Sequence, residues 1–297
     1  MIFRETLNRL LPEVEEALDE LFAAVVTNQT HEQDLLLIGI NGCYYEERLK
    51  WNINTSPFSF GPGDWSYETD HTQARFFNSY RKQIRDESRA EFYKLVAQNP
   101  EIALVADHSV QTELSIYQKF WESNRMLKRL YHLSNLGQGK NYDWYYDSQK
   151  PSSRQKIIRT LIRDPLEIIS PKFYALLKDI YHPQIRNAVA HSEFYIVGTT
   201  LGFNNYDVAK HHPLTQISFE LWEERFHRLI LLYNGLIKRF NASLKEYILQ
   251  QDDKEFGLQI RLTNPDGTTE TRFIKYVDVN RPDWMWYNHW KKNHKNK

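Results

Sequence analysis

The sequence predicts a mainly α-helical protein, a helical bundle that carries small β-hairpins. Apolar residues recur every three or four positions through most of the long segments, which is the period of an α-helix. Serine, proline and glycine stand near the ends of several of these segments, where helices begin and end. Runs of β-branched and aromatic residues are short, and two of them flank turn signals.

Charge sets a first limit on function. The 297 residues include 38 basic and 38 acidic side chains, so the formal net charge is zero. A protein that coats nucleic acid nonspecifically needs a broad positive field, and this composition argues against that class. A net charge of zero is compatible with an enzyme that holds a few nucleotides in a local cleft.

The sequence indicates a cytoplasmic protein without a membrane segment. Mean hydropathy is -0.64, and no apolar run approaches the roughly 20 residues that span a membrane. Acidic residues are spread through the first helical segment, so no signal peptide is expected. Cys43 is the single cysteine, which excludes an intrachain disulfide.

Residues 1–100 are predicted to form helices and loops of unknown role. The first helix follows from apolar residues at helical spacing, namely Leu7, Leu11, Val14, Leu18, Leu21 and Val25. The apolar run 35–40 is predicted to be a strand. Residues 52–68 hold Asn, Ser, Pro and Gly without periodicity and are predicted to be a long loop, and a polar helix over 71–98 follows.

Residues 101–251 are predicted to hold the core bundle. A long helix ends at Gly137 and presents one apolar face, made of Ile116, Phe120, Leu127, Leu130 and Tyr131. The polar stretch 137–153 is predicted to be a linker or excursion. A shorter helix over 153–163 stops before Pro165, because the residue that precedes a proline avoids helical geometry.

The rest of the predicted bundle follows from helix starts and one hairpin. Ser-Pro at 170–171 begins a helix that His-Pro at 182–183 interrupts, and a new helical turn starts there. The segment around Gly198 is predicted to be a small hairpin. Ser218 is predicted to cap the longest helix, whose apolar stripe runs for about eight turns and comprises Trp222, Phe226, Leu229, Ile230, Tyr233, Ile237, Phe240, Leu244, Tyr247 and Ile248.

Residues 252–297 are predicted to form a β-hairpin and a basic tail. Two segments of β-type residues flank Asn-Pro-Asp-Gly at 264–267, which is a strong hairpin signal. The final residues, HWKKNHKNK, are predicted to be a disordered tail.

One short motif carries chemical information. Arg186, Asn187 and His191 lie in the segment IRNAVAHSEF, with four residues between the arginine and the histidine. An apolar helix precedes the motif, a short β excursion follows it, and a long amphipathic helix closes the region. The segment resembles the signature of the HEPN superfamily (higher eukaryotes and prokaryotes nucleotide-binding), and the resemblance covers about residues 110–250.

The resemblance implies a HEPN-like helical bundle and a metal-independent endoribonuclease of antiviral defence or of a toxin system. It further implies a homodimer with a composite active site, RNA such as tRNA or mRNA as substrate, and no cofactor. It also allows for an antitoxin or another regulatory partner protein.

The residue types of the motif suit RNA cleavage without a metal ion. A histidine can act as general acid or base because the ordinary pKa of an imidazole lies near neutrality, and the motif supplies His191 for this role. Arg186 can hold phosphate oxygens through two parallel hydrogen bonds, and Asn187 can orient the arginine or the phosphate. Five residues apart, the two side chains lie about 140° from one another on an ideal helix, so a symmetric dimer would help to bring two motifs together.

A structural interpretation of the motif stands beside the catalytic one. Arg186 could pair with an acid of the bundle such as Asp179 or Glu193, while His191 bonds a carbonyl and Asn187 caps the turn. The chain would then be a non-catalytic module that binds a nucleotide or a protein, or that dimerises.

Other candidate residues are weaker. Lys156, Arg159 and Arg163 recur at i, i+3 and i+7 and could guide an RNA backbone, although a solvated helix face explains them as well. Cys43 could be a nucleophile, or a small buried hydrophobic residue. A third hypothesis places a ligand site at Cys43 or in the aromatic-rich loop 51–67.

Metal and nucleotide-hydrolysis motifs are absent from the sequence. His211 and His212 are adjacent and point in different directions, and no paired spacing of metal ligands occurs. No glycine-rich phosphate loop is found either.

Overall fold

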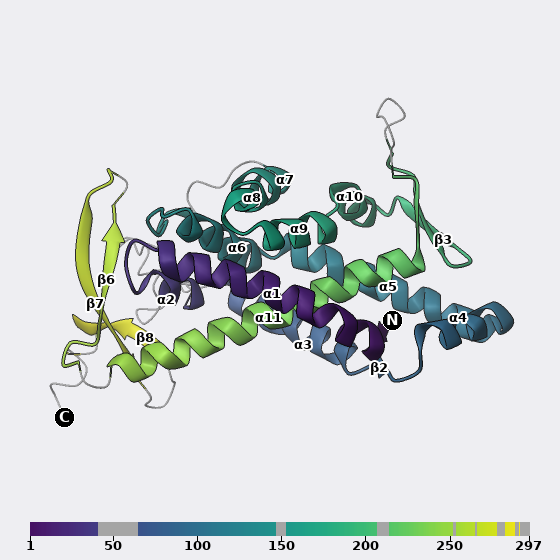
Figure 1. Cartoon of the computed structure of the whole chain (residues 1–297), viewed down its shortest axis with the longest axis horizontal. Coiled ribbons are helices and arrows are strands. Elements are labelled where there is room, and N and C mark those ends of the chain that lie inside the picture. Colours follow the sequence, from purple (N-terminus) through teal and green to yellow (C-terminus); the bar gives the residue numbers. More distant parts are fainter. Residues whose placement is uncertain are drawn as a thin grey trace. The chain divides into compact units, whose positions relative to one another are not determined.

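The computed structural model describes residues 1–40, 65–146, 153–206, 214–251, 254–264, 266–277, 283–288 and 291. These residues form a mainly helical protein, which confirms the predicted fold class (Figure 1). No described helix combines the length and the apolarity that crossing a membrane requires.

The chain divides into two compact units, each built from three segments. The first unit comprises Met1–Leu18, Asp70–Ser123 and Pro171–Gly235, and the second comprises Asp19–Thr69, Asn124–Ser170 and Leu236–Lys297. Both units take segments from either side of residue 100. A HEPN-like bundle over 101–251 stays a prediction.

Three helices, α1 (Arg4–Asn28), α3 (Trp65–Arg81) and α11 (Phe219–Gln251), contribute residues to both units. The other elements of the first unit are β1 (Ile2–Phe3), β2 (Ile84–Arg85), α4 (Arg89–Gln98), α5 (Pro100–Glu122), α9 (Pro171–Ile180), α10 (Pro183–His191), β3 (Phe194–Val197), β4 (Thr200–Phe203) and β5 (Gln216–Ser218). Those of the second unit are α2 (Asp34–Gly39), α6 (Asn124–Gly137), α7 (Arg154–Lys156), the π-helix η3 (Ile157–Arg163), α8 (Leu166–Ile169), β6 (Leu258–Thr263), β7 (Thr269–Val277) and β8 (Asp283–Trp286).

The predicted hairpins and the cap of the longest helix are confirmed. Strands β3 and β4 pair antiparallel on either side of Gly198, and β6 and β7 pair antiparallel on either side of Gly267. Both glycines have positive φ, at 57° and 84°, a conformation that glycine adopts without strain. Each hairpin gains a third strand, β5 or β8. The Ser218 hydroxyl accepts a hydrogen bond from the Leu221 amide at 3.3 Å, as an N-cap does.

The single helix predicted over 71–98 is wrong, because the chain breaks after Arg81. The two residues of β2 pair in parallel with β1. A new helix then starts with a capping box, in which the Ser88 hydroxyl accepts from the Glu91 amide at 3.2 Å and the Glu91 carboxylate accepts from the Ser88 amide at 3.1 Å. The Ser-x-x-Glu spacing of a capping box is present in the sequence at 88–91. Because a helical period continues on both sides of it, the sequence did not indicate that a new helix starts there.

Two other predicted elements are also wrong. The helix predicted to end at Gly137 is two helices, because Ser123 is extended and separates α5 from α6. The run 35–40 belongs to helix α2 instead of a strand; every residue of α2 is buried, and a short apolar run cannot distinguish the two structures by period. Residues 52–64 of the predicted loop lie outside the described residues, and α3 begins at Trp65.

The polar stretch 137–153 is anchored in its first half and is not a simple linker there. Tyr142, Trp144 and Tyr146 are buried within the second unit. The Trp144 indole donates to the Arg261 carbonyl of β6 at 3.0 Å. The predicted helix over 153–163 consists of α7 and the π-helix, and it ends at Arg163, two residues before Pro165.

A buried carboxylate lies at the centre of the first unit. Glu113 of α5 is fully buried. It accepts hydrogen bonds from the Tyr80 hydroxyl of α3 at 2.7 Å and from the Trp222 indole of α11 at 2.8 Å. The amino group of Met1 contacts the same carboxylate. Because a buried carboxylate is stable only when donors surround it, these contacts connect β1, α3 and α11 to α5.

We predict that Glu113→Gln lowers the free energy of unfolding by about 2 kcal/mol or more, because one acceptor oxygen becomes an amide donor that faces buried donors. Chemical denaturation would measure the loss. Glu101→Gln, at an exposed position of the same helix, should change stability little. Equal losses in the two variants would show that the buried contacts of Glu113 do not stabilise the fold.

Helix α11 also carries a buried histidine, His227. Its Nε2 accepts from the Phe3 amide at 2.9 Å, and its Nδ1 lies 2.6 Å from the Glu223 carbonyl oxygen. The ring is therefore a neutral imidazole with the proton on Nδ1. Burial lowers the pKa of His227 to about 3.

The lowered pKa of His227 gives a prediction for pH. The unfolded chain binds a proton on this side chain near pH 6.5 and the folded chain does not, so this contribution to stability is present above pH 6.5 and is lost as the pH falls toward 3. The stability difference between wild type and His227→Gln should narrow on acidification by up to about 1.4 kcal/mol per pH unit. Leu229→Ala, a buried substitution that removes no titratable group, should differ from wild type by a constant amount. If the stability difference between wild type and His227→Gln does not change with pH, the lowered pKa of His227 is contradicted.

Candidate functional site

Helix α10 positions the Arg-Asn-x-x-x-His motif within the first unit. Pro183 stands in its first turn, and Ile185 and Ala188 are buried. The helix contacts α5. It ends at His191, because Ser192 adopts a left-handed conformation with φ 58° and the Glu193 amide bonds back to the Ala188 carbonyl at 2.8 Å.

Arg186 is held in place by two side chains. Its Nη1 donates to Glu122 Oε1 at 2.7 Å and its Nη2 donates to Asn187 Oδ1 at 2.5 Å. The arginine side chain is only 16% exposed and that of Glu122 is 36% exposed. Asn187 thus orients the guanidinium group, one of the two roles expected for it.

The acid that pairs with Arg186 is none of those suggested by the sequence. Asp179 instead bonds Arg228 at 3.2 Å, and its carbonyl accepts from Arg225. Glu122 is the last residue of α5, 64 positions before the arginine, so no local spacing relates the two. Only the packing of α10 on α5 reveals it.

His191 differs from Arg186 in its surroundings. The residue is exposed, and its ring makes no hydrogen bond or ion pair with the described part of the chain. The carbonyl bond anticipated by the structural interpretation is therefore absent there. The imidazole nitrogens of His191 are open to solvent and to a ligand.

A second histidine lies close to the motif and was not singled out by the sequence. His182 precedes α10, and its carbonyl accepts from the Arg186 amide at 3.1 Å, so the two residues are one helical turn apart. Burial, followed by the charge of Arg225, lowers the pKa of His182 to about 4. This histidine is therefore neutral at physiological pH.

The three basic residues predicted to bind RNA and the motif on α10 belong to different compact units. Lys156, Arg159 and Arg163 belong to the second unit, whereas α10 belongs to the first. Lys156 and Arg159 are exposed, and Arg163 is bound to Asp164 through two nitrogens at 2.6 and 2.8 Å. Because a π-helix turns less per residue than an α-helix, positions i, i+3 and i+7 do not form the single face that the sequence suggested. Their role in RNA binding stays a prediction.

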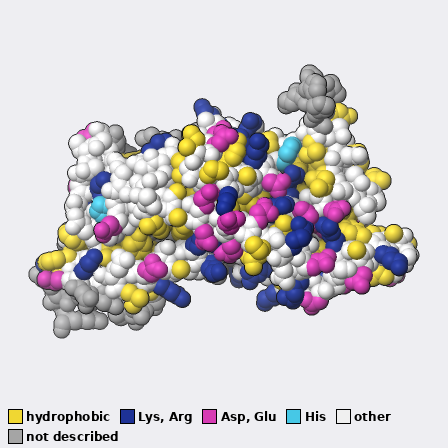
Figure 2. Space-filling view, viewed as in Figure 1, with side chains coloured by type: hydrophobic (Ala, Val, Ile, Leu, Met, Phe, Trp, Pro, Cys, Tyr) yellow, Lys and Arg dark blue, Asp and Glu magenta, His cyan; other side chains and the backbone are white. Residues whose placement is uncertain are grey.

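Charge on the surface agrees with the neutral composition. On the face shown in Figure 2, basic and acidic side chains are interspersed and no continuous basic field appears. Several of these charges are paired in the first unit, as Arg9 with Glu224 and Arg89 with Glu220.

Within the described residues, no group of three or more His, Cys, Asp or Glu side chains could hold a metal ion. Cys43, the loop 51–64, His211 and His212 lie outside the described residues. Comparisons with protein-family models, with curated proteins and with solved structures gave no match.

The end of α10 generates a stability prediction. A non-glycine residue with φ near 58° carries a strain of about 1 kcal/mol. Ser192→Gly should therefore raise the free energy of unfolding by about 0.5–1 kcal/mol, as measured by thermal or chemical denaturation. Ser192→Ala keeps the strain and should give no gain. A gain from alanine as large as that from glycine would contradict the explanation.

Proposed function

We propose that the chain is a metal-independent endoribonuclease that uses His191 and Arg186. The observation that supports this best is the contrast between the two side chains: an arginine held by Glu122 and Asn187, and an exposed imidazole at the end of the same helix with no hydrogen bond to the described residues. The resemblance of the motif to the HEPN signature favours the same chemistry, in a defence or toxin system.

The reaction would be a transesterification. His191 accepts the proton of the ribose 2′-hydroxyl, whose oxygen attacks phosphorus while the bond to the 5′-oxygen breaks. Arg186 binds the non-bridging oxygens and stabilises the additional negative charge of the transition state. The products are a 2′,3′-cyclic phosphate and a 5′-hydroxyl that has taken up a proton.

The leaving 5′-oxygen needs an acid. His182 is unsuited to this role at neutral pH, because its pKa of about 4 leaves it without the proton. Arg186 and His191 also diverge by about 140° around the helix axis. A homodimer that presents two His191 side chains to one phosphate would supply both a base and an acid, so the proposal includes a composite site.

The ion pair between Arg186 and Glu122 limits how Arg186 can bind a phosphate of the substrate. Phosphate and Glu122 are both anions that bind the same guanidinium group, so a phosphate either displaces Glu122 or uses the remaining face of Arg186. The same contact favours a second candidate function, a non-catalytic module that binds a nucleotide or a partner protein, because both terminal nitrogens of the arginine already donate hydrogen bonds within the chain.

The proposal is tested by incubating the purified protein with total RNA and with tRNA in EDTA. We expect wild type to cleave RNA and to leave 2′,3′-cyclic phosphate ends. His191→Ala and Arg186→Ala should each reduce the rate by about 100-fold or more. His31→Ala, a histidine substitution in the second unit, should cleave like wild type.

Equal cleavage by wild type and His191→Ala would overturn the mechanism. If neither cleaves, while Arg186→Ala and Glu122→Ala lose stability to a similar extent, the binding module becomes the better account. Analytical ultracentrifugation of the same samples tests the homodimer separately.

A further inference from the structure

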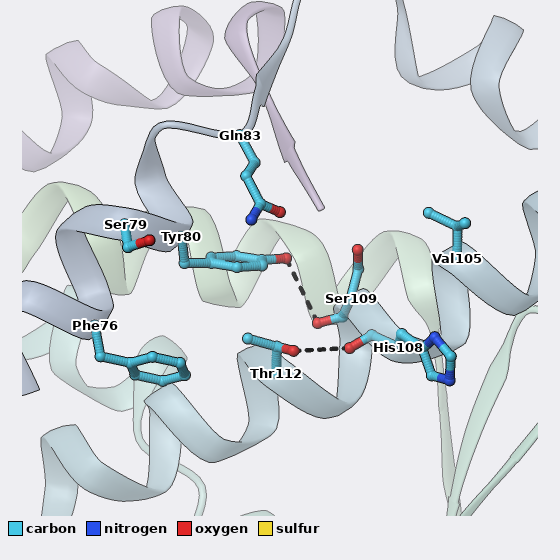
Figure 3. A pocket seen from close by; sticks show the side chains of 8 residues that line it. All are labelled: Phe76, Ser79, Tyr80, Gln83, Val105, His108, Ser109 and Thr112. Carbon is cyan, nitrogen blue, oxygen red and sulfur yellow. Dashed lines mark hydrogen bonds between the residues drawn. The ribbon is translucent and has the colours of Figure 1, made fainter.

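A pocket of about 380 Å³ lies between α3 and α5 of the first unit (Figure 3). Its volume falls in the range of about 300–1,000 Å³ that is usual for small-molecule sites. The lining residues are Phe76, Ser79 and Tyr80 of α3, Gln83 of the turn that follows α3, and Val105, His108, Ser109 and Thr112 of α5. In Figure 3 the Tyr80 and Phe76 side chains extend from α3 toward Ser109 and Thr112 of α5.

One wall of the pocket is fixed by the buried network. The Tyr80 hydroxyl donates to Glu113 at 2.7 Å and lies 3.5 Å from the Ser109 carbonyl oxygen. Tyr80 is buried, so its ring cannot turn into solvent. This aromatic face is therefore present before any ligand binds.

Several polar side chains of the pocket make no hydrogen bond with the described residues. Ser79, Gln83 and His108 make no side-chain hydrogen bond with the part of the chain that the structure describes, whereas Ser109 contacts the Tyr80 hydroxyl. Thr112 donates to the His108 carbonyl at 2.9 Å, which leaves its oxygen able to accept. Hydroxyl, amide and imidazole groups that converge on an aromatic wall suit a ring that carries both donors and acceptors.

An aromatic residue and a cation lie at one end of the pocket. Phe76 is 40% exposed, and the Lys119 ammonium group lies 5.1 Å from the centre of its ring. Lys119 follows Thr112 by seven positions on α5, which is two helical turns or about 10 Å. A ligand ring that stacks on Phe76 can therefore place an anionic substituent near Lys119.

We propose that this pocket binds a free nucleoside monophosphate, a planar heteroaromatic ring joined to an anionic group. The base stacks on the Phe76 and Tyr80 rings, Gln83 and Ser109 bond its polar edge, and the phosphate pairs with Lys119. A purely apolar ligand fits less well, because it would remove these polar groups from water without replacing their hydrogen bonds.

This site is distinct from the one on α10. His108 precedes Glu122 by fourteen positions along α5, which corresponds to about 21 Å. The phosphate end of the pocket is nearer, because Lys119 precedes Glu122 by three positions, but the two proposed sites share no residue. The inference is therefore independent of whether Arg186 and His191 cleave RNA.

Isothermal titration calorimetry of the full chain with AMP, GMP, CMP and UMP tests the proposal, with adenosine and inorganic phosphate as partial ligands. At least one monophosphate should bind. Phe76→Ala and Gln83→Leu should each weaken that binding tenfold or more. Lys119→Gln should weaken the monophosphate tenfold or more but leave adenosine unchanged, and Lys94→Gln, on the exposed surface of α4, should leave both unchanged.

The proposal is overturned if no monophosphate binds, or if binding survives Phe76→Ala, Gln83→Leu and Lys119→Gln unchanged. Circular dichroism and thermal unfolding establish that each variant is folded. If one of the three variants is unfolded, the other two are enough to test the proposal. Binding to His191→Ala should equal that of wild type, which separates this site from the proposed nuclease.

Discussion

The burial of one carboxylate determines much of the first unit. Glu113 has no access to water, so its oxygens must receive hydrogen bonds from the protein. The donors come from α3 and α11 and from the first residue of the chain, and each must reach a fixed point inside α5. Polar geometry thus restricts how these elements pack, in addition to the aromatic contacts around them, such as Tyr117 with Trp222 at 5.4 Å between ring centres.

Helix α5, which carries Glu113, also carries residues that position both candidate sites. Four residues after Glu113, the Tyr117 hydroxyl donates to the Ile180 carbonyl at 3.1 Å and accepts from the His182 amide at 2.9 Å. These bonds fix the connection between α9 and α10, and hence the position from which Arg186 reaches Glu122 at the end of α5. On the same helix, Ser109 and Thr112 form one wall of the pocket. A single helix therefore supports the proposed nuclease motif and the proposed nucleotide pocket.

The sequence predicted local features well and distant ones poorly. The hairpin around Gly198, the cap at Ser218 and the stop before Pro165 depend on neighbouring residues, and all three are confirmed. The break at Ser123 was missed because apolar spacing continues across it. Three other features depend on tertiary packing, which no single segment encodes. They are the ion pair of Arg186 with Glu122, the burial of Trp144 against β6 and the π-helical geometry of 157–163.

The division of the chain has a consequence for how such a protein can evolve. The chain crosses from one compact unit to the other at five points, and three of these crossings fall inside the continuous helices α1, α3 and α11. A single genetic exchange at any one point would separate residues that belong to the same unit. The two units are therefore expected to be inherited together, and change should accumulate by substitution within them more readily than by recombination between them.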